Sequence, residues 1–270
     1  MISENNKKKS RREFLIASAA LAGGFISLTL LKPFSALGDD ADKVDIKEGA
    51  AGSGADALTK KDYWYGFGFD IEKCIGCGKC ADACKKENNV STEPFYFRTW
   101  VEQYTVKIDG TVKIESPNGG IDGFKQSVPE EEILRSYFVP KACNHCADSP
   151  CVDVCPTGAS FISPEGVVLA DLKYCIGCAY CVQACPYGCR YIDPKTQMVD
   201  KCTLCYHRIT KGLSPACVEV CPTGARIYGN LHDKKSALVA FINSHNCWVL
   251  KPYLNTKPKL FYNDLREEVR

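Results

Sequence analysis

Residues 175–186 of this chain read CIGCAYCVQACP, with four cysteines spaced C-x2-C-x2-C-x3-C and a proline directly after the last one. Three thiolates on so short a loop can reach three corners of one small iron–sulfur cube. Where this spacing holds a pair of 4Fe–4S clusters, the fourth cysteine ligates the neighbouring cluster. The stretch therefore predicts one 4Fe–4S site and a second site beside it.

Three further groups of four cysteines lie in the same part of the chain. Residues 74–84 (motif one) repeat the spacing of residues 175–185 (motif three), whereas residues 143–155 (motif two) and 202–221 (motif four) are spaced differently. Sixteen of the eighteen cysteines fall into these motifs and are the candidate iron ligands: Cys74, Cys77, Cys80, Cys84, Cys143, Cys146, Cys151, Cys155, Cys175, Cys178, Cys181, Cys185, Cys202, Cys205, Cys217 and Cys221.

The spacing between motifs leaves their pairing in space partly open. CIGC at 74–77 recurs at 175–178, and CPTGA at 155–159 recurs at 221–225, which suggests a duplicated unit of two motifs. Motif three begins twenty positions after motif two ends, so these two can form one compact module and leave motifs one and four to form the other. Motif four begins only seventeen positions after motif three ends, so a pairing of three with four is equally allowed by distance.

Other uses of the cysteines fit less well. Zinc ribbons use C-x2-C pairs, but the third and fourth cysteines of these runs do not have zinc-ribbon spacing. Motif four, with eleven residues between Cys205 and Cys217, leaves a zinc site more open than the others. Cys189 and Cys247 have no motif partners and are expected to be buried thiols.

Composition argues against other classes of function. The formal net charge is only +2, which gives no sign of the basic patch or stripe that nucleic-acid binding usually needs. The sequence also offers no nucleophile–base set, so no catalytic residue is predicted and the chain is expected not to be an enzyme by itself.

Residues 1–38 have the three-part layout of a secretory signal, with a basic start, an apolar stretch and a small-residue exit. Ser10–Leu15 (SRREFL) resembles the twin-arginine export motif, and Phe14–Leu31 is an apolar run of eighteen residues. A retained membrane anchor is the alternative, and no cysteine precedes Cys74 that could carry a lipid. Because the twin-arginine route exports folded proteins, clusters can be inserted in the reducing cytoplasm before export, and we expect a periplasmic location. Residues 39–61 are expected to form a linker or extension.

The elements expected around the motifs are short. They are an antiparallel hairpin at 104–115 about Asp109-Gly110, a shorter hairpin at 161–169 and a helix at 236–243. Beyond Cys84 no apolar run approaches the length that would span a membrane.

Several stretches together resemble a known family. They are CNHC at 143–146, CPYG at 185–188, Lys201-Cys202, CPTGAR at 221–226, and LKP followed by TKP within 250–258. From about Tyr65 to Lys259 the chain is similar to the four-cluster electron-transfer subunits of the dimethyl sulfoxide reductase, polysulfide reductase and formate-dependent nitrite reductase type. It departs from them by a longer insertion at 96–139.

The resemblance implies that motifs one and four share one pair of clusters and motifs two and three share the other. The implied ligand sets are Cys74, Cys77, Cys80 and Cys221; Cys84, Cys202, Cys205 and Cys217; Cys143, Cys146, Cys151 and Cys185; and Cys155, Cys175, Cys178 and Cys181. The expected cofactors are therefore four 4Fe–4S clusters.

The resemblance also implies an α+β fold of two ferredoxin-like dicluster modules related by pseudo-two-fold symmetry. The outer module is expected to comprise 62–95 and 200–235, and the inner module 140–199. Residues 96–139 are expected to form a hairpin-bearing insertion and 236–270 a C-terminal extension.

The function implied is a relay of single electrons through the four clusters. The expected partners are a quinone-interacting integral membrane subunit and a catalytic molybdopterin subunit or multihaem cytochrome, with the chain held at the membrane through a partner. A free ferredoxin-like shuttle and a structural or assembly protein with non-cycling clusters are the alternatives. His145 is expected to be an exposed loop residue or a hydrogen-bond donor. Lys79, Lys201 and Arg190 lie beside cysteines, where a cation either raises a cluster's potential or is ordinary surface charge.

Overall fold

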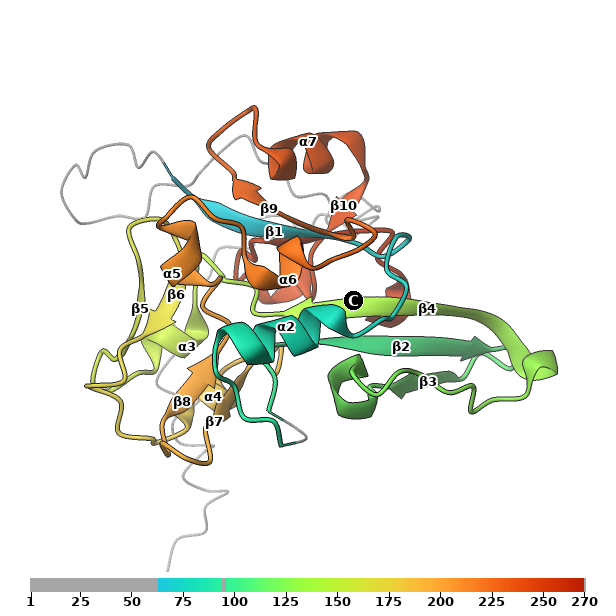
Figure 1. Cartoon of the computed structure of the whole chain (residues 1–270), viewed down its shortest axis with the longest axis horizontal. Coiled ribbons are helices and arrows are strands. Elements are labelled where there is room, and N and C mark those ends of the chain that lie inside the picture. The colour runs from blue at the N-terminus through green and yellow to red at the C-terminus, as the bar shows by residue number, and fades with distance from the viewer. Residues whose placement is uncertain (1–62, 94–95, 270) are drawn as a thin grey trace, which may run out of the picture. The chain divides into compact units, whose positions relative to one another are not determined.

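The computed structural model describes residues 63–93 and 96–269 (Figure 1). The predicted export signal (1–38) and linker (39–61) therefore lie outside the described residues. Within the described ranges, no helix combines the length and apolar character that crossing a membrane requires. This part of the chain mixes short helices with small sheets, which is compatible with the predicted α+β class.

One four-stranded sheet joins the first strand of the described chain to its last. Its order is β10-β11-β1-β9, with the bounds β1 (Tyr65–Asp70), β9 (Arg226–Asn230), β10 (Cys247–Trp248) and β11 (Leu260–Asn263). β1 runs parallel to β11 and antiparallel to β9, so both of its neighbours come from the C-terminal third of the chain (Figure 1). Residues 236–270, expected only as an extension, thus supply two strands of this sheet.

The sequence of β1 (YGFGFD) alternates aromatic residues with glycine because the strand is crowded on both faces. Its two phenylalanines are buried in the core. A Cβ at Gly66 would lie 2.6 Å from the carbonyl oxygen of Lys259, and a Cβ at Gly68 would lie 2.6 Å from the ring of Phe241. Glycine therefore allows α7 (Ala237–Ser244), which carries Phe241, to pack against β1. The N-terminus of α7 is capped by Ser236, whose Oγ accepts a hydrogen bond from the backbone N–H of Leu238 at 3.3 Å.

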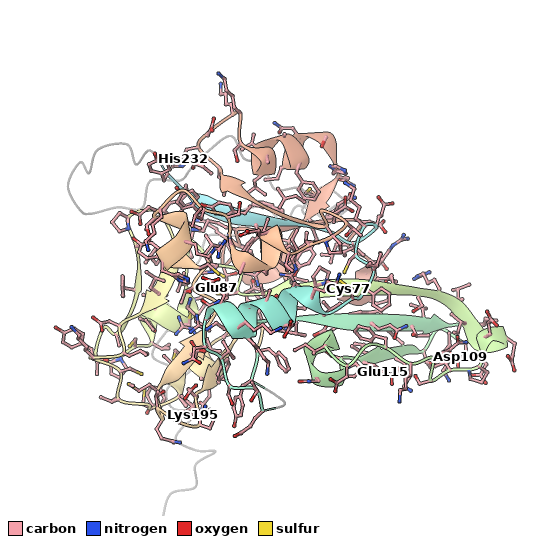
Figure 2. All side chains as sticks on the ribbon, in the orientation of Figure 1. Cys77, Glu87, Asp109, Glu115, Lys195 and His232 are labelled. Carbon is pink, nitrogen blue, oxygen red and sulfur yellow. The ribbon has the colours of Figure 1, made fainter. Side chains whose placement is uncertain are left out.

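Residues 96–139 are built around a three-stranded sheet of order β3-β2-β4. Its strands are β2 (Thr99–Lys107), β3 (Val112–Glu115) and β4 (Ile133–Ala142), with 3-10 turns at η1 (Pro117–Gly120) and η2 (Glu130–Glu132). β2 and β3 form an antiparallel hairpin whose tip is marked by Asp109 in Figure 2. Gly110 adopts φ +84° there, and Asp109 Oδ1 accepts a hydrogen bond from the backbone N–H of Thr111 at 2.8 Å. β4 ends at Ala142, so this sheet leads the chain directly into motif two.

Short helices follow the cysteine loops. They are α2 (Lys79–Glu87), α3 (Pro150–Asp153), α4 (Tyr180–Gln183), α5 (Tyr206–Ile209) and α6 (Ala216–Glu219). A Cys-Pro pair follows α3, α4 and α6, and because the residue before a proline disfavours the helical conformation, these helices end after one turn. Two hairpins complete the motif regions: β5 (Ser160–Ile162) with β6 (Val168–Ala170), and β7 (Arg190–Ile192) with β8 (Val199–Lys201). The chain ends with the 3-10 turns η3 (Pro252–Leu254) and η4 (Glu267–Val269).

The hydrophobic core is continuous with the cysteine motifs. Phe67, Phe69 and Tyr262 are buried together, with the rings of Phe69 and Tyr262 in edge contact at 5.6 Å between centroids. The hydroxyl of Tyr262 donates a hydrogen bond to the carbonyl oxygen of Pro140 at 3.0 Å, which ties β11 to β4. Cysteines of motifs one, two and four belong to the same buried cluster of side chains, so the core supports their loops directly.

Candidate metal centres

Four cavities in the described structure are each lined by four motif cysteines, and Cys189 is a fifth lining cysteine of the cavity that contains Cys143. We name them site A (Cys74, Cys77, Cys80, Cys221), site B (Cys84, Cys202, Cys205, Cys217), site C (Cys143, Cys146, Cys151, Cys185) and site D (Cys155, Cys175, Cys178, Cys181). Their empty volumes, counted with the adjoining open solvent, are similar: about 330, 280, 340 and 330 Å³. All sixteen predicted cysteines thus come together in four sets, and these are the sets that the family resemblance implied.

Motif one shows how a short stretch serves two sites. Gly76 and Gly78 adopt φ +69° and +66°, which curls the loop before α2 (Figure 2 labels Cys77 on this loop). Cys80 then lies in the first turn of α2 and Cys84 lies one turn later. Residues four apart share a face of a helix but are separated by about one turn, so Cys80 lines site A while Cys84 lines site B.

Sites A and B are neighbours because Cys80 and Cys84 lie one turn apart on α2, and sites B and C are neighbours because Ala142, which lines site B, directly precedes Cys143 of site C. Burial raises the pKa of Cys217 (site B) to about 11, and the charge of Cys80 (site A) acts in the same direction. Burial raises the pKa of Cys202 (site B) to about 12, and Cys143 (site C) adds to that increase. Site B therefore lies between sites A and C.

Arg190 connects site C to site D. Burial works to lower the pKa of Arg190, but the thiolates of Cys151 and Cys143 (site C) and Cys181 (site D) raise it above its ordinary value. The order of the four sites is therefore A-B-C-D. Among the sixteen cysteines, all of them described, the exposed ones are Cys77 in site A and Cys178 in site D, at the two ends of this row.

Burial keeps several thiols protonated near neutral pH. It raises the pKa of Cys84 well above its ordinary value and that of Cys146 to about 12. Cys185 differs, because a hydrogen bond from the buried thiol Cys189 lowers its pKa to about 6. Since iron binds thiolate, loading of these sites must release protons.

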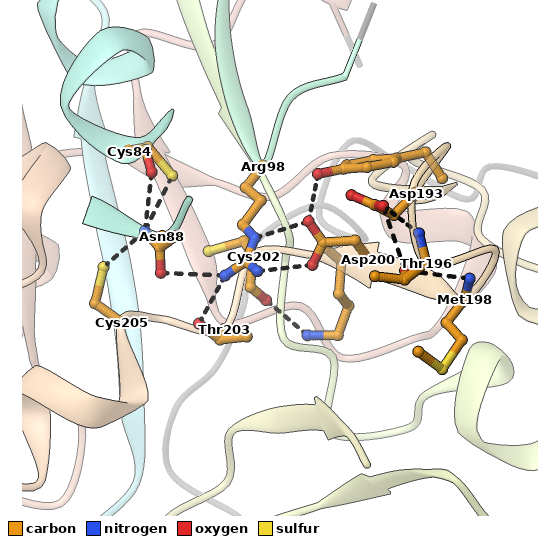
Figure 3. A network of polar contacts seen from close by, with 12 residues as sticks. Cys84, Asn88, Arg98, Asp193, Thr196, Met198, Asp200, Cys202, Thr203 and Cys205 are labelled. Atoms are coloured by element: carbon orange, nitrogen blue, oxygen red, sulfur yellow. Dashed lines mark hydrogen bonds and ion pairs between the residues drawn. The ribbon is translucent and has the colours of Figure 1, made fainter. Parts of the chain in front are cut away.

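Site B carries a network of polar side chains that sequence reasoning missed (Figure 3). The amide Nδ2 of Asn88 contacts the Sγ atoms of Cys84 and Cys205 at 3.5 and 3.6 Å. Its Oδ1 accepts a hydrogen bond from Arg98 Nη1 at 3.1 Å, and Arg98 pairs with the carboxylate of Asp200 at 2.8 Å.

Tyr191 extends this network, since its hydroxyl donates to Asp200. These residues come from the C-terminal cap of α2, the start of the insertion, and the β7–β8 hairpin, so no local pattern in the sequence links them.

The three charged residues that lie beside cysteines in the sequence differ in their burial. Lys79 is exposed, whereas Arg190 and Lys201 are buried, so ordinary surface charge is the wrong interpretation for those two. Lys201 Nζ donates hydrogen bonds to the carbonyl oxygens of Val168 and Cys202.

His145 is not an exposed loop residue. It is 2% exposed, its Nδ1 accepts a hydrogen bond from the backbone N–H of Val168 at 3.1 Å, and burial lowers its pKa well below the ordinary value. The backbone of β6 contacts the loop through Val168, which the local sequence CNHC could not reveal.

Comparison with known proteins places these sites in a family. Two models, each described as a 4Fe-4S dicluster domain, match residues 73–159 and 134–231. A tetrathionate reductase subunit of Salmonella typhimurium is 42% identical over 200 residues, covering 73% of this chain and 71% of that protein. A polysulfide reductase polypeptide of Wolinella succinogenes is 36% identical over 198 residues (73% and 92%), and Protein NrfC of Escherichia coli is 39% identical over 201 residues (73% and 79%). This protein belongs to the same family of reductase iron–sulfur subunits.

As an iron–sulfur subunit of this family, the chain contains two tandem ferredoxin-type dicluster domains and so carries four 4Fe–4S clusters. Both domain matches include motif two, whereas in space motif one shares its sites with motif four. The two matched ranges therefore do not correspond to the two pairs of motifs that come together in space.

The residues that line the cavities fit such clusters. Each cavity is lined by the sulfur atoms of four motif cysteines, and cavity C also by that of Cys189. Within residues 63–93 and 96–269 no three His, Cys, Asp or Glu side chains converge as they would on a single ion. Buried side-chain nitrogens without a partner in the described structure include those of Asn144, Arg190 and Arg226, which line cavities C or A, and Nε2 of His145, which lines neither. Sulfide and thiolate sulfurs are acceptors for such donors.

Proposed function

We propose that this chain relays single electrons between a quinone-reactive integral membrane subunit and a catalytic or cytochrome partner of a respiratory redox complex. The observation that carries the proposal is the row A-B-C-D, with exposed cysteines only at its two ends among the sixteen. The names of the relatives, which are subunits of tetrathionate and polysulfide reductases, support a partnered role.

The four cysteines of each site are proposed to ligate one cluster. Support comes from the cavities, because the motif cysteines that line each one are three from one motif and one from the paired motif, with Cys189 as an additional lining cysteine of site C. When bound, each cluster would supply a centre that takes up and releases one electron at a time. The thiolates hold the metal, and the core side chains around sites B and C exclude water from the middle of the row.

We also propose two dicluster modules related by a pseudo-two-fold axis. The outer module comprises 62–95 and 200–235, and the inner module comprises 140–199. The loops of motifs one and three support this relation, since Gly76 and Gly177 both adopt φ +69°, and Gly78 and Ala179 adopt φ +66° and +61°. The chain is proposed to have no catalytic site of its own, because its most prominent reactive side chains, the cysteines, are concentrated at the four sites.

The two ends of the row carry exposed apolar side chains that suit protein contacts. Ile75, two residues before Cys77, is 58% exposed, and Ile176, two residues before Cys178, is 67% exposed. Tyr174 and Tyr180 are also exposed on the motif-three loop. Exposed apolar groups clustered at a point of electron entry are typical of an interface with a partner.

We also propose that the folded chain reaches the periplasm by the twin-arginine route and is held at the membrane by its partner. The proposal rests on residues 10–15 and on the need to load cysteines in a reducing compartment. Replacing Arg11 and Arg12 by lysine should retain the loaded protein in the cytoplasm. A periplasmic fraction unchanged by the double substitution would contradict this route.

The relay is tested by isolating the full chain in its native complex under anaerobic conditions. We expect co-purification with an integral membrane subunit and a second redox subunit, and reversible reduction through added quinol. A chain that cycles but purifies alone would favour the free shuttle. Clusters that do not cycle would favour a structural or assembly role.

Matched substitutions localise the two ends. Ile75→Asp and Ile176→Asp should each slow electron exchange with one partner only, with full iron content retained. Ile108→Asp is the control, because Ile108 is equally exposed at 66% but lies beside the tip of the β2–β3 hairpin. If the control slows exchange as much as the other two, the partners do not dock at the exposed cysteine loops.

A further inference from the structure

Two arginines occupy equivalent places in motifs three and four. Arg190 is the fifth residue after Cys185 and begins β7, while Arg226 is the fifth residue after Cys221 and begins β9. In both cases the chain passes from the last cysteine of a motif through a tight turn into a strand that aims the arginine back at the cysteines.

Both guanidinium groups are buried without a carboxylate partner in the part of the chain that the structure describes. Arg190 is 4% and Arg226 is 3% exposed, and neither takes part in a salt bridge with a described residue. Arg190 Nη1 donates a hydrogen bond to Ser160 Oγ at 2.8 Å, but its Nε and Nη2 have no described partner. Both Nη atoms of Arg226 also lack one, and this guanidinium lies over the ring of Phe69 at 4.4 Å.

A buried cation without an anion is strongly unfavourable, so these groups need a negative partner. The cavities supply it. Arg226 lines site A, and besides three cysteines of that site its charge acts on Cys217 of site B. Arg190 lines site C and acts on Cys181 of site D as well as on Cys143 and Cys151. Each arginine therefore faces two neighbouring sites.

We propose that each of these arginines is a shared counter-cation for one pair of clusters, Arg226 for sites A and B and Arg190 for sites C and D. The proposal rests on the ligand sets proposed above. A fixed positive charge favours the more negative, reduced state of any cluster near it. Each arginine thus raises the potentials of both members of its pair and eases the repulsion between two negative groups placed side by side.

The equivalent positions in the other two motifs carry no charge. Five residues after Cys155 stands Ser160, which accepts the hydrogen bond from Arg190, and five residues after Cys84 stands Asn89. Each pair of sites therefore receives one cation at this position. Lysine would keep the charge but not the planar group of donors that can reach two sites at once.

The test is a redox titration of the full-length, cluster-loaded chain followed by electron paramagnetic resonance. In Arg226→Gln, two of the four midpoint potentials should fall. At a fixed applied potential, the reduced-to-oxidised ratio of each of these two clusters should decrease at least tenfold, which equals a shift of 59 mV for one electron. In Arg190→Gln the other two should fall. Arg266→Gln is the control, since Arg266 is half-exposed and pairs with Asp264 away from the four cavities.

Several outcomes would overturn the proposal: no shift in either variant, a shift of one cluster only, or an equal shift of all four. Iron and labile sulfide are measured on every sample. If the glutamine variants lose iron while Arg226→Lys and Arg190→Lys retain it, positive charge is required and the proposal is supported. If the lysine variants are also empty, the arginines serve folding and the proposal fails. A wild-type chain without iron would instead refute the proposed function.

Discussion

Asn88 offers a direct test of how side chains around site B set its redox potential. Its Nδ2 contacts the Sγ atoms of Cys84 and Cys205 at 3.5 and 3.6 Å and the carbonyl oxygen of Cys84 at 3.1 Å (Figure 3). Asn88→Leu keeps a side chain of similar length but removes both N–H groups. Because these donors stabilise sulfur most when the cluster is reduced and more negative, the substitution should lower the midpoint potential of the site B cluster.

The size of the effect follows from the contacts. A hydrogen bond to a charged group contributes about 1.5–3 kcal/mol, but here two hydrogens serve three acceptors and the contacts to sulfur are long. Only the difference between the two oxidation states changes the potential, so we take about 1 kcal/mol in total. Since about 1.4 kcal/mol corresponds to 59 mV for one electron, the expected decrease is about 40 mV.

The assay is an anaerobic redox titration of the loaded chain, with all four midpoints determined. Thr203→Val is the matched control, because Thr203 lines the same cavity and accepts from Arg98 at 3.4 Å without donating to sulfur. We expect one midpoint to fall in Asn88→Leu and none to move in the control. An unchanged or higher potential in Asn88→Leu, or an equal decrease in the control, would refute the reasoning.

Four further substitutions test the sites and the core. Gly78→Ala should deplete about one cluster per chain in an iron assay, because a Cβ there would lie 2.1 Å from the carbonyl oxygen of Gly120 at φ +66°; full iron content would contradict this. Cys84→Ser and Cys205→Ser should remove the same paramagnetic signal although they belong to different motifs, and loss of different signals would show that they serve different clusters. Leu260→Ala should destabilise the fold by about 2–5 kcal/mol, seen as a lower unfolding temperature at full iron loading, since Leu260 is fully buried in β11; an unchanged temperature would contradict its place in the core.

Local patterns predicted what local geometry determines. The cysteine spacing identified sixteen residues that line cavities, and the turn at Asp109-Gly110 lies at the tip of the β2–β3 hairpin. The helix at α7 follows Ser236, whose hydroxyl caps it. In each case the deciding residues lie within a few positions of one another.

Contacts between distant parts of the chain were not predictable in the same way. Asn88 reaches Cys205 across 117 positions, and Arg98 reaches Asp200 across 102. Apart from its place in CPTGAR, nothing in the sequence marked Arg226 as a functional residue, because only the folded chain shows that its charge is buried. The parallel pairing of β1 with β11 also joins opposite ends of the described chain, and neither strand carries a pattern that names its partner.

The most direct test of the account is an anaerobic assay of iron and acid-labile sulfide on the full chain, combined with a redox titration followed by electron paramagnetic resonance. Four neighbouring 4Fe–4S clusters should give about sixteen iron and sixteen sulfide per chain, with several reversible and mutually coupled signals. Zinc in place of iron, or iron sufficient for one pair of clusters or fewer, would contradict this prediction.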